Sequence, residues 1–308
     1  GKIFLGSEGG KYCQRERKGI QALEGAGIST AQLEGHGYLE DNGAEVLLLE
    51  YLPQVKHLSE CFASSPEDVT TQLETAIKMI AVMHGKSLVH NDCHLDNFLV
   101  NAQGLYLIDG DAVAQASALS QTDALHNLAL FYVQLPLSFT SRAAEFFALY
   151  CEQRALSTAA YLPAFQQALQ SQRDNRQRRF LKKVFRDCTQ FKVIKSWSRF
   201  IAQDRQADCP ELQALIANPD HYIEAGDLLK DGNSATVAKV SVGNKAYVVK
   251  RYNLKSVTHW LTRFWRPSRA WASWHNAQLL CFYGISTPQP LAMIEQRCGI
   301  LRGKAYFI

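Results

Sequence analysis

The chain has 308 residues, of which 47% are hydrophobic and 20% charged, and its net charge is +4 at pH 7. This composition is ordinary for a soluble globular protein, and the length favours about two domains. The mild charge gives no indication of nucleic-acid binding, and no apolar run approaches the roughly 18 residues that a membrane span needs. Eight scattered cysteines without a CxxC pair indicate a reducing, cytoplasmic compartment, where most of them are expected in the core.

The N-terminal part predicts a small sheet with one helix. "GKIFLG" is typical of a strand, and "CQRERKGIQALEGAG" predicts a helix that ends at Gly25 and Gly27. "AQLEGHGYLEDNGAEVLLLEYL" predicts two strands joined by an Asp-Asn-Gly turn. The second of these strands is almost entirely apolar, which indicates that it is buried.

The following part is mainly helical. "SPEDVTTQLETAIKMIAVMHGKSL" opens with good helix-start residues and repeats apolar residues at helical spacing. The polar stretch "HNDCHLDN", a turn at "NAQG" and the apolar strand "LYLIDGD" come next. From Asp123 to about residue 219 the pattern is helical, without a further strand. Strands first and helices later predict an α+β domain with segregated layers.

The tetrapeptide "GIST" occurs twice, at Gly27–Thr30 and at Gly284–Thr287, each time after an amphipathic helix that follows a lysine-bearing strand. Self-similarity at this spacing indicates two copies of one domain type. We expect one domain over residues 1–219, helical from about residue 60, and the start of another over 220–308. A first residue other than methionine and a strand pattern at the last residues indicate a piece of a longer gene product.

Three residues in and after "HNDCHLDN" have the spacing of a phosphoryl-transfer site. Asp92 and Asn97 share one loop, and Asp109 follows a turn and a buried strand. Such a hairpin brings Asn97 and Asp109 together and leaves Asp92 at the loop tip. Two oxygen ligands beside a free carboxylate suit Mg²⁺. Phosphoryl transfer needs an Asp to accept the proton of the substrate hydroxyl, and an Asn and an Asp to hold metal on the phosphates.

Two other interpretations of this stretch remain open. His90, Cys93 and His94 carry zinc-ligand side chains, although no second ligand pair at zinc spacing lies nearby. A purely structural polar turn is the other interpretation. It would make the spacing of the two carboxylates and the amide a coincidence.

The stretch resembles the catalytic loop of the protein-kinase-like fold, with "HNDCHLDN" in place of HRDxxxxN and "DGD" at Asp109–Asp111 in place of DFG. It is most similar to the bacterial lipopolysaccharide kinases, which phosphorylate heptose or Kdo of the inner core. The resemblance covers residues 1 to about 200 and begins again near residue 222. It implies an ATP- and Mg²⁺-dependent phosphotransferase with a bilobal fold, nearly complete in the first unit and a partial N-lobe in the second.

The resemblance also implies roles for the loop residues. Asp92 would be the catalytic base, and Asn97 and Asp109 would complete the catalytic set as Mg²⁺ ligands. Asn91 replaces the usual arginine, which argues against control by a phosphorylated activation loop. His94 replaces the lysine of protein kinases, as in many small-molecule kinases of this fold.

Four further residues are matched to supporting roles. Lys2 would hold the α- and β-phosphates of the nucleotide, and Glu16 would pair with Lys2. His90 would pack behind the loop, and Asp123 resembles the buried helix aspartate that braces it. The plainer interpretations are a solvated lysine near the chain terminus and an exposed helix glutamate with an i,i+4 partner.

The second copy contains a turn of small residues, Asp231–Ala235, followed by Lys250 as its nucleotide-binding lysine. Small residues let backbone N–H groups approach phosphates. Ser273 aligns with Glu16, so the lysine–glutamate pair is expected to be missing. No catalytic loop follows, and this copy on its own is expected to be inactive.

The expected partner is a lipopolysaccharide core sugar or a lipid-linked precursor, without nucleic acid. The basic segment Arg173–Arg186 is typical of a solvated helix face. Alternatively, this segment and the tryptophan- and arginine-rich segment Trp260–Trp274 would contact anionic lipid at the cytoplasmic face of the inner membrane. Two functional alternatives also stand. One is a kinase with another small-molecule or protein acceptor, and the other is a pseudokinase that scaffolds lipopolysaccharide assembly.

Overall fold

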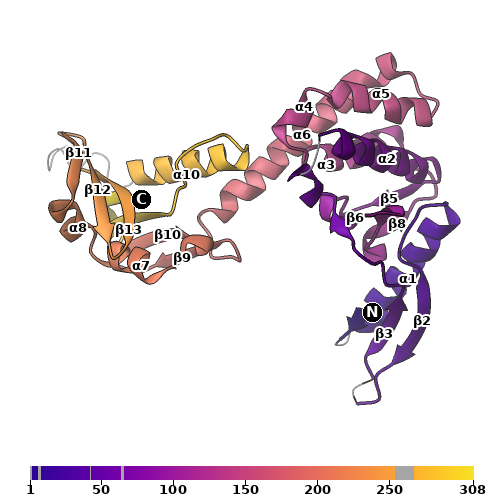
Figure 1. Cartoon of the computed structure of the whole chain (residues 1–308), viewed down its shortest axis with the longest axis horizontal. Coiled ribbons are helices and arrows are strands. Elements are labelled where there is room, and N and C mark those ends of the chain that lie inside the picture. The colour runs from indigo at the N-terminus through magenta and orange to yellow at the C-terminus, as the bar shows by residue number, and fades with distance from the viewer. Residues whose placement is uncertain (1, 6–7, 42, 64–65, 254–266) are drawn as a thin grey trace. The chain divides into compact units, whose positions relative to one another are not determined.

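The computed structural model describes residues 2–5, 8–41, 43–63, 66–253 and 267–308. The chain divides into two compact units, Gly1–Asp174 and Asn175–Ile308 (Figure 1). Both units combine helices with antiparallel sheet, which confirms the predicted α+β class.

The first unit opens with β1 (Lys2–Phe4), α1 (Gly9–Gly25), β2 (Leu33–Tyr38) and β3 (Glu45–Leu49). The strands are antiparallel in the order β1-β3-β2, so the predicted hairpin is present; Asn42 of its turn lies outside the described residues. Helical spacing puts Cys13, Ile20 and Leu23 on the buried face of α1. Glu16 lies on the same face and is therefore buried as well.

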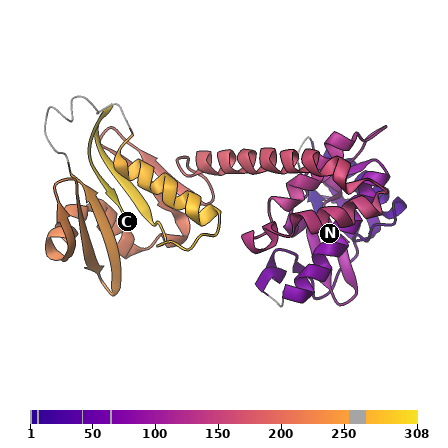
Figure 2. The same ribbon diagram turned by 90° about the horizontal axis from the view of Figure 1, so that it is seen from above.

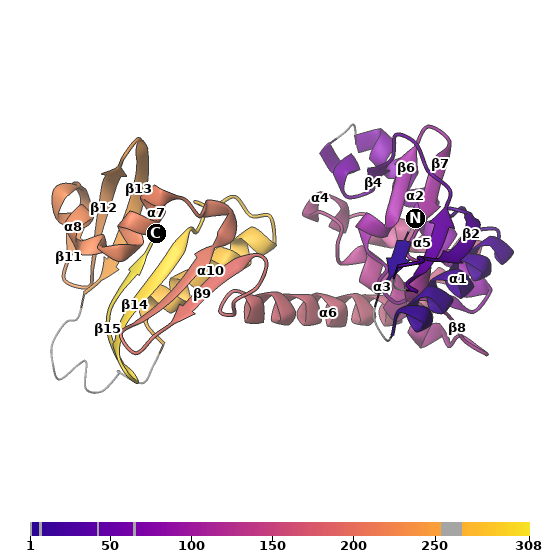
Figure 3. The same cartoon turned by 90° about the horizontal axis from the view of Figure 1, so that it is seen from below.

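The rest of the first unit is mainly helical. Its elements are β4 (Lys56–His57), η1 (Glu60–Ala63), α2 (Pro66–Gly85), β5 (Leu88–His90), η2 (Leu95–Asn97), β6 (Phe98–Asn101), β7 (Gly104–Leu107), η3 (Gly110–Ala112), β8 (Val113–Gln115), α3 (Gln121–Tyr132), α4 (Leu137–Thr140), α5 (Ala143–Gln153) and α6 (Thr158–Lys183). β6 pairs with β7 (Figure 3), and β5 pairs with β8. These two pairings bring the β5–β6 loop beside the segment after β7.

The second unit is built on one seven-stranded antiparallel sheet in the order β11-β12-β13-β15-β14-β10-β9. Its elements are β9 (Phe191–Lys195), β10 (Arg199–Asp204), η4 (Arg205–Ala207), α7 (Pro210–Ala217), α8 (Pro219–Ala225), β11 (Asp227–Gly232), β12 (Ala235–Val242), β13 (Lys245–Tyr252), α10 (Arg269–Phe282), β14 (Ala292–Cys298) and β15 (Leu301–Phe307). α10 lies along one face of the sheet and contacts β14 and β15 (Figure 2).

β9 and β10 contradict the prediction that no strand lies between Asp123 and residue 219. Both strands are short and adjoin a strongly basic helix, so their apolar residues look like a continuation of the helical pattern. β10 pairs with β14, far along the chain, and therefore belongs to the second sheet. The structure consequently divides the chain after Asp174 and not at the expected boundary between residues 219 and 220.

The two units share a local arrangement of strands. Lys2 of β1 pairs with Leu47 of β3, and Lys250 of β13 pairs with Phe307 of β15. In each unit the strand that follows the helix lies on the other side of that partner, giving the orders β1-β3-β2 and β13-β15-β14. The two lysines therefore occupy equivalent positions in their sheets.

The two "GIST" segments end their helices in the same way. Gly27 and Gly284 have positive φ angles of 76° and 66°, a backbone region that glycine enters without strain. The N–H groups of Ile28 and Ile285 then donate to the leucine carbonyls five residues earlier, at 2.9 and 3.0 Å. This is the Schellman closure of a helix, and it gives the repeated letters a physical cause.

The tryptophan-rich segment Trp260–Trp274 is only partly described, because residues 254–266 lie outside the described residues. Trp274 is buried, and its Nε1 donates to the carbonyl oxygen of Val184 at 2.9 Å. Trp271 stacks on Phe185, with ring centroids 3.8 Å apart. These two tryptophans therefore belong to the interior of the second unit. In the part of the chain that the structure describes, no helix is long and apolar enough to cross a membrane.

Candidate active site

The loop between β5 and β6 is anchored from inside by His90, which is fully buried. The Nε2 of its ring lies 3.0 Å from the carbonyl oxygen of Ile108, to which the neutral ring donates. Burial lowers the pKa of His90, so the ring stays uncharged at neutral pH. The imidazole thus ties the loop to the residue just before Asp109, in the packing position that the sequence predicted.

Asp92 and Asn97 are linked through the backbone of the loop. The Nδ2 of Asn97 donates to the carbonyl oxygen of Asp92 at 2.7 Å, and the carbonyl of Asn97 accepts from the N–H of Ile108 at 2.9 Å. The second bond sets Asn97 beside the segment that carries Asp109. The carboxylate of Asp92 is exposed, with Oδ1 3.3 Å from Nε2 of His94. Because the Asn97 amide nitrogen is engaged, its side-chain oxygen is the atom left to face a cation.

Lys2, Glu16 and Asp109 form a chain of ion pairs. The Nζ of Lys2 lies 2.8 Å from Oε1 of Glu16 and 3.1 Å from Oδ1 of Asp109. Burial works against the charge of Lys2, but the two carboxylates outweigh it and raise its pKa above the ordinary value. Asp109 has a left-handed backbone with φ of 71°, which is uncommon outside glycine and typical of functional segments. The structure therefore brings these three predicted residues together.

Glu16 is also joined to the segment after Asp109. Its second oxygen, Oε2, accepts from the N–H of Asp111 at 2.9 Å, and the carboxylate of Asp111 pairs with Nε of Arg15 at 2.8 Å. These contacts give Asp111 a structural task in its turn. Lys2, Glu16, Asp109 and Asp111 line one pocket of about 280 Å³ together with residues of β1 and the start of α1.

Two glycines allow α1 to approach η3 at backbone distance. A Cβ on Gly19 would lie 1.9 Å from the carbonyl oxygen of Gly110, and a Cβ on Gly110 would lie 2.4 Å from the carbonyl oxygen of Glu16. Any side chain at these positions would force the helix away from the Asp109 segment. The glycine of "DGD" is thus required by packing.

The braces of the loop come from α3 and from the residues after it, and sequence reasoning missed them. The Nδ2 of Asn127 donates to the carbonyl oxygen of His90 at 2.9 Å. Gln134 clamps the loop twice, donating to the carbonyl of Cys93 at 2.8 Å and accepting from the N–H of Leu95 at 3.2 Å. In the sequence, Asn127 is visible only as an uncharged amide on a mostly apolar helix, one turn beyond Asp123.

The prediction that Asp123 braces the loop is wrong. Its carboxylate is exposed at the start of α3, where it accepts from the hydroxyl of Ser120 at 2.6 Å. The N–H of Asp123 in turn donates to that hydroxyl, which is the geometry of a helix N-cap. Asp123 therefore stabilises its own helix end and not the loop.

The zinc interpretation of "HNDCHLDN" is not supported by the positions of its side chains. His90 and Cys93 are buried, His94 is exposed beside Asp92, and these residues form no ligand cluster among the described residues.

In the second unit the position of Glu16 is taken by Ser273, as expected. The hydroxyl of Ser273 lies 2.5 Å from that of Tyr252 and does not reach Lys250. The Nζ of Lys250 lies 5.2 Å from the centre of the Tyr252 ring, and the described residues offer it no ion pair. The lysine–carboxylate chain of the first unit therefore has no counterpart in the described part of the second.

Comparison with known proteins finds a family model that matches part of the first unit. Residues 9–150 match the model of the Lipopolysaccharide kinase (Kdo/WaaP) family. This range contains the site described above except for Lys2. No curated protein matches the chain.

Among solved structures, the chain is similar to WaaP in complex with acyl carrier protein, with 16% identity, a TM-score of 0.42, and coverage of 54% of this chain and 75% of that one. A second match is WbdD in complex with a kinase inhibitor, with 20% identity, a TM-score of 0.35, and coverage of 54% of this chain and 38% of that one. A third is the PknI kinase domain of Mycobacterium tuberculosis, with 16% identity, a TM-score of 0.32, and coverage of 53% and 79%.

Proposed function

We propose that this chain transfers the γ-phosphoryl group of ATP to a heptose or Kdo hydroxyl of the lipopolysaccharide inner core. The match of residues 9–150 to the model of the Lipopolysaccharide kinase (Kdo/WaaP) family supports this proposal. The observation that carries the proposal is the ion-pair chain of Lys2, Glu16 and Asp109, set beside a loop that presents Asp92 and Asn97. These are the parts that phosphoryl transfer needs at one place.

The residues fit a magnesium site. Asn97 and Asp109 offer an amide oxygen and a carboxylate, and both are the hard ligands that Mg²⁺ prefers. When bound there with ATP, Mg²⁺ would neutralise charge on the phosphates. Lys2, fixed by Glu16, would hold the phosphates in the pocket that these residues share with Asp109. Asp92, exposed at the loop tip, would orient the acceptor hydroxyl and take its proton.

This mechanism works by positioning and charge, without a covalent intermediate. Glu16 holds the lysine, and the Asn97 amide keeps the Asp92 backbone still through its 2.7 Å bond. The loop is locked from behind by His90, Asn127 and Gln134. Rigid support of this kind keeps reacting groups near their productive geometry.

We further propose that the second unit is a partial copy of the first unit's N-lobe. The equivalent lysine positions and the matching helix ends support this proposal. Lys250 is then the counterpart of Lys2, but the described residues of the second unit offer it no carboxylate that would hold it on a phosphate. We infer that the second unit binds or scaffolds rather than catalyses.

The enzyme would work at the cytoplasmic face of the inner membrane, on a lipid-linked sugar acceptor. The charged side chains of the basic segment Arg173–Arg186 are largely exposed, which suits contact with anionic lipid. Its apolar residues Phe180, Val184 and Phe185 pack within the second unit, so contact would be electrostatic and not by insertion. Co-sedimentation with anionic vesicles but not with neutral ones, abolished by salt, is expected. Equal binding to both vesicles would remove the membrane partner from the proposal.

Replacement of Asp92 by Asn tests the catalytic proposal. We expect kcat for phosphate transfer from ATP to heptose- or Kdo-containing core acceptors to fall by about 10²–10⁴, the usual contribution of a general base. Thermal stabilisation by ATP and Mg²⁺ should persist, since Asp92 lies outside the lysine chain. Asp123→Asn is the matched control, because that exposed carboxylate caps a helix, and its activity should match wild type.

Two outcomes would contradict the proposal. Unchanged transfer by Asp92→Asn would remove this residue from the reaction. A wild-type chain that neither transfers phosphate nor gains stability from ATP and Mg²⁺ would favour the scaffold function for both units.

A further inference from the structure

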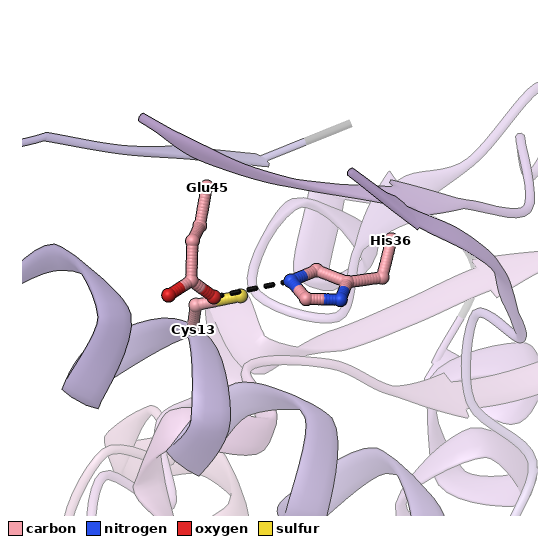
Figure 4. Close-up of side chains that lie close together, drawn as sticks. All are labelled: Cys13, His36 and Glu45. Atoms are coloured by element: carbon pink, nitrogen blue, oxygen red, sulfur yellow. Dashed lines mark hydrogen bonds and ion pairs between the residues drawn. The ribbon is translucent and has the colours of Figure 1, made fainter. Parts of the chain in front are cut away.

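Three metal-ligand side chains meet in the first unit, between α1 and its small sheet. They are Cys13 on α1, His36 on β2 and Glu45 on β3, and one ligand atom from each lies within 4.8 Å of the other two. Nε2 of His36 is 3.1 Å from Oε2 of Glu45. Figure 4 shows the three side chains pointing toward one another from three different elements. Their separation in sequence hides the cluster from any motif search.

The cluster is partly buried and partly exposed. Cys13 is buried at 1% exposure, whereas the side chains of His36 and Glu45 are 27% and 23% exposed, so the site is open on one side. Gly10 makes room for Glu45, since a Cβ at this glycine would lie 2.5 Å from Oε1 of the carboxylate. A carboxylate is thus accommodated beside a thiol that the chain keeps out of water.

The second unit shows what the same positions look like without ligands. Strand pairing matches Glu45 to Ala305, because each pairs with the residue two places after the lysine. It also matches His36 to Met293. His36 pairs with Leu47, the partner of Lys2, and Met293 pairs with Phe307, the partner of Lys250. Counting back from Gly27 and Gly284 matches Cys13 to Ala270.

All three counterparts are apolar and at most 2% exposed: Ala270, Met293 and Ala305. Ala270 and Ala305 lie in one apolar cluster of the second unit. Packing at these positions therefore calls for apolar side chains. The first unit instead carries a sulfur, an imidazole and a carboxylate, a substitution that packing alone does not explain.

We propose that Cys13, His36 and Glu45 bind a zinc ion. Sulfur, nitrogen and oxygen together are the ligand set of Zn²⁺, whereas Mg²⁺ and Ca²⁺ take oxygen ligands. Contraction of the three atoms onto zinc needs only small side-chain movements, because His36 and Glu45 already lie within hydrogen-bond distance. The described residues supply three ligands, which leaves a fourth tetrahedral position for water or an external group.

The ion would act on the position of α1. Cys13 lies one turn before Glu16 on the same buried face, and the other two ligands come from the sheet. A bound zinc ion would therefore fasten the helix that carries the partner of Lys2 to β2 and β3. Without metal, burial raises the pKa of the Cys13 thiol to about 11, so zinc must displace a proton as it binds.

Metal titration of the whole 308-residue chain tests the site. The purified, reduced and chelator-treated protein is expected to take up one equivalent of Zn²⁺, and Co²⁺ in its place should give the near-ultraviolet thiolate-to-cobalt absorption band. His36→Gln and Glu45→Gln should each weaken Zn²⁺ binding by at least about 10-fold, and Cys13→Ser should abolish the band. Cys61→Ser is the matched control: this thiol is also buried in the first unit but donates to the carbonyl of His57.

Two results would overturn the proposal. One is a protein that binds Zn²⁺ but shows no thiolate-to-cobalt band when Co²⁺ replaces it, and the other is a band that persists in Cys13→Ser. If Cys13→Ser does not fold, the partly exposed His36→Gln decides alone: unchanged affinity in this variant would likewise reject the site. Because Co²⁺ at the oxygen ligands Asn97 and Asp109 gives no thiolate band, the result does not depend on the proposed magnesium site.

Discussion

Glu16 joins three segments through two oxygens. One oxygen holds Lys2 of β1, the other accepts from Asp111 after the "DGD" turn, and the residue itself belongs to α1. A buried carboxylate is tolerated only when it is paired and hydrogen-bonded, and Glu16 meets both conditions. The ion pair with Lys2 and the hydrogen bond from Asp111 therefore offset the desolvation of the buried Glu16 carboxylate.

His84 should give the first unit a dependence on acid. Its buried ring lies 2.8 Å from the hydroxyl of Tyr150 and 3.1 Å from Oδ1 of Asn127, and burial lowers its pKa from 6.5 to about 4. The unfolded chain binds the proton more readily, so the stability this group provides is full above pH 6.5 and is lost as the pH falls towards 4. The loss can reach about 3 kcal/mol.

Urea unfolding between pH 7 and pH 4.5 measures this effect. His84→Gln should flatten the profile relative to wild type, whereas His126→Gln, at an exposed position of the neighbouring helix α3, should preserve it. Parallel profiles for wild type and His84→Gln would show that the ring does not titrate as described.

Much of the site geometry could be predicted at this scale. The spacing of Asp92, Asn97 and Asp109 indicated a shared site, and the structure sets Asn97 beside the Asp109 segment through strand pairing. Asn127 could not be predicted, because an amide that braces a backbone carbonyl leaves no periodic or charge pattern. Cys13, His36 and Glu45 could not either, since only the packing of α1 on the sheet brings them together.

At the scale of elements, α1 is positioned by the absence of side chains as much as by its apolar face. The helix meets η3 at Gly19 and Gly110, and its end is fixed by the positive φ of Gly27. The sequence predicted the helix and its end correctly, because periodicity and terminal glycines are local signals. It missed β9 and β10, whose strand character depends on pairing with β14 and is not local.

Gly19→Ala should destabilise the first unit by about 1–3 kcal/mol or more, because its Cβ would lie 1.9 Å from a carbonyl oxygen that belongs to backbone. Gly25→Ala is the matched control on the same helix. No atom of the described residues outside its own helix lies within 4 Å of its Cβ position. Helix propensity should therefore make the variant equal to or up to about 1 kcal/mol more stable than wild type. Chemical denaturation of both variants checks the difference, and equal stabilities would refute the close approach.

For the whole molecule, sheet pairing decides which residues belong to which unit. The boundary after Asp174 falls inside α6, so one helix contributes Phe165 and Leu169 to the core of the first unit and Phe180 to that of the second. Two domains were expected from the chain length and the repeat, but the boundary depends on the partner of β10, which no local pattern reveals.

Separate cores predict separate unfolding. Phe147 is buried in the first unit and stacks on Phe165 with ring centroids 4.3 Å apart, so Phe147→Ala should cost about 3–5 kcal/mol there. Calorimetry should show one transition lowered and a second unchanged. Phe200→Ala, in the core of the second unit, should lower the other transition instead. A single transition that moves with both variants would mean that the units unfold together.

The contact between Gly19 and Gly110 has a mechanical consequence. The backbones of α1 and η3 meet at these glycines with no side chain between them. We therefore expect α1 and the segment that carries Asp109 to move together. A tilt of α1 that withdraws Glu16 from Lys2 would therefore also displace Asp109. Lysine support and the proposed metal ligand would then be gained or lost together.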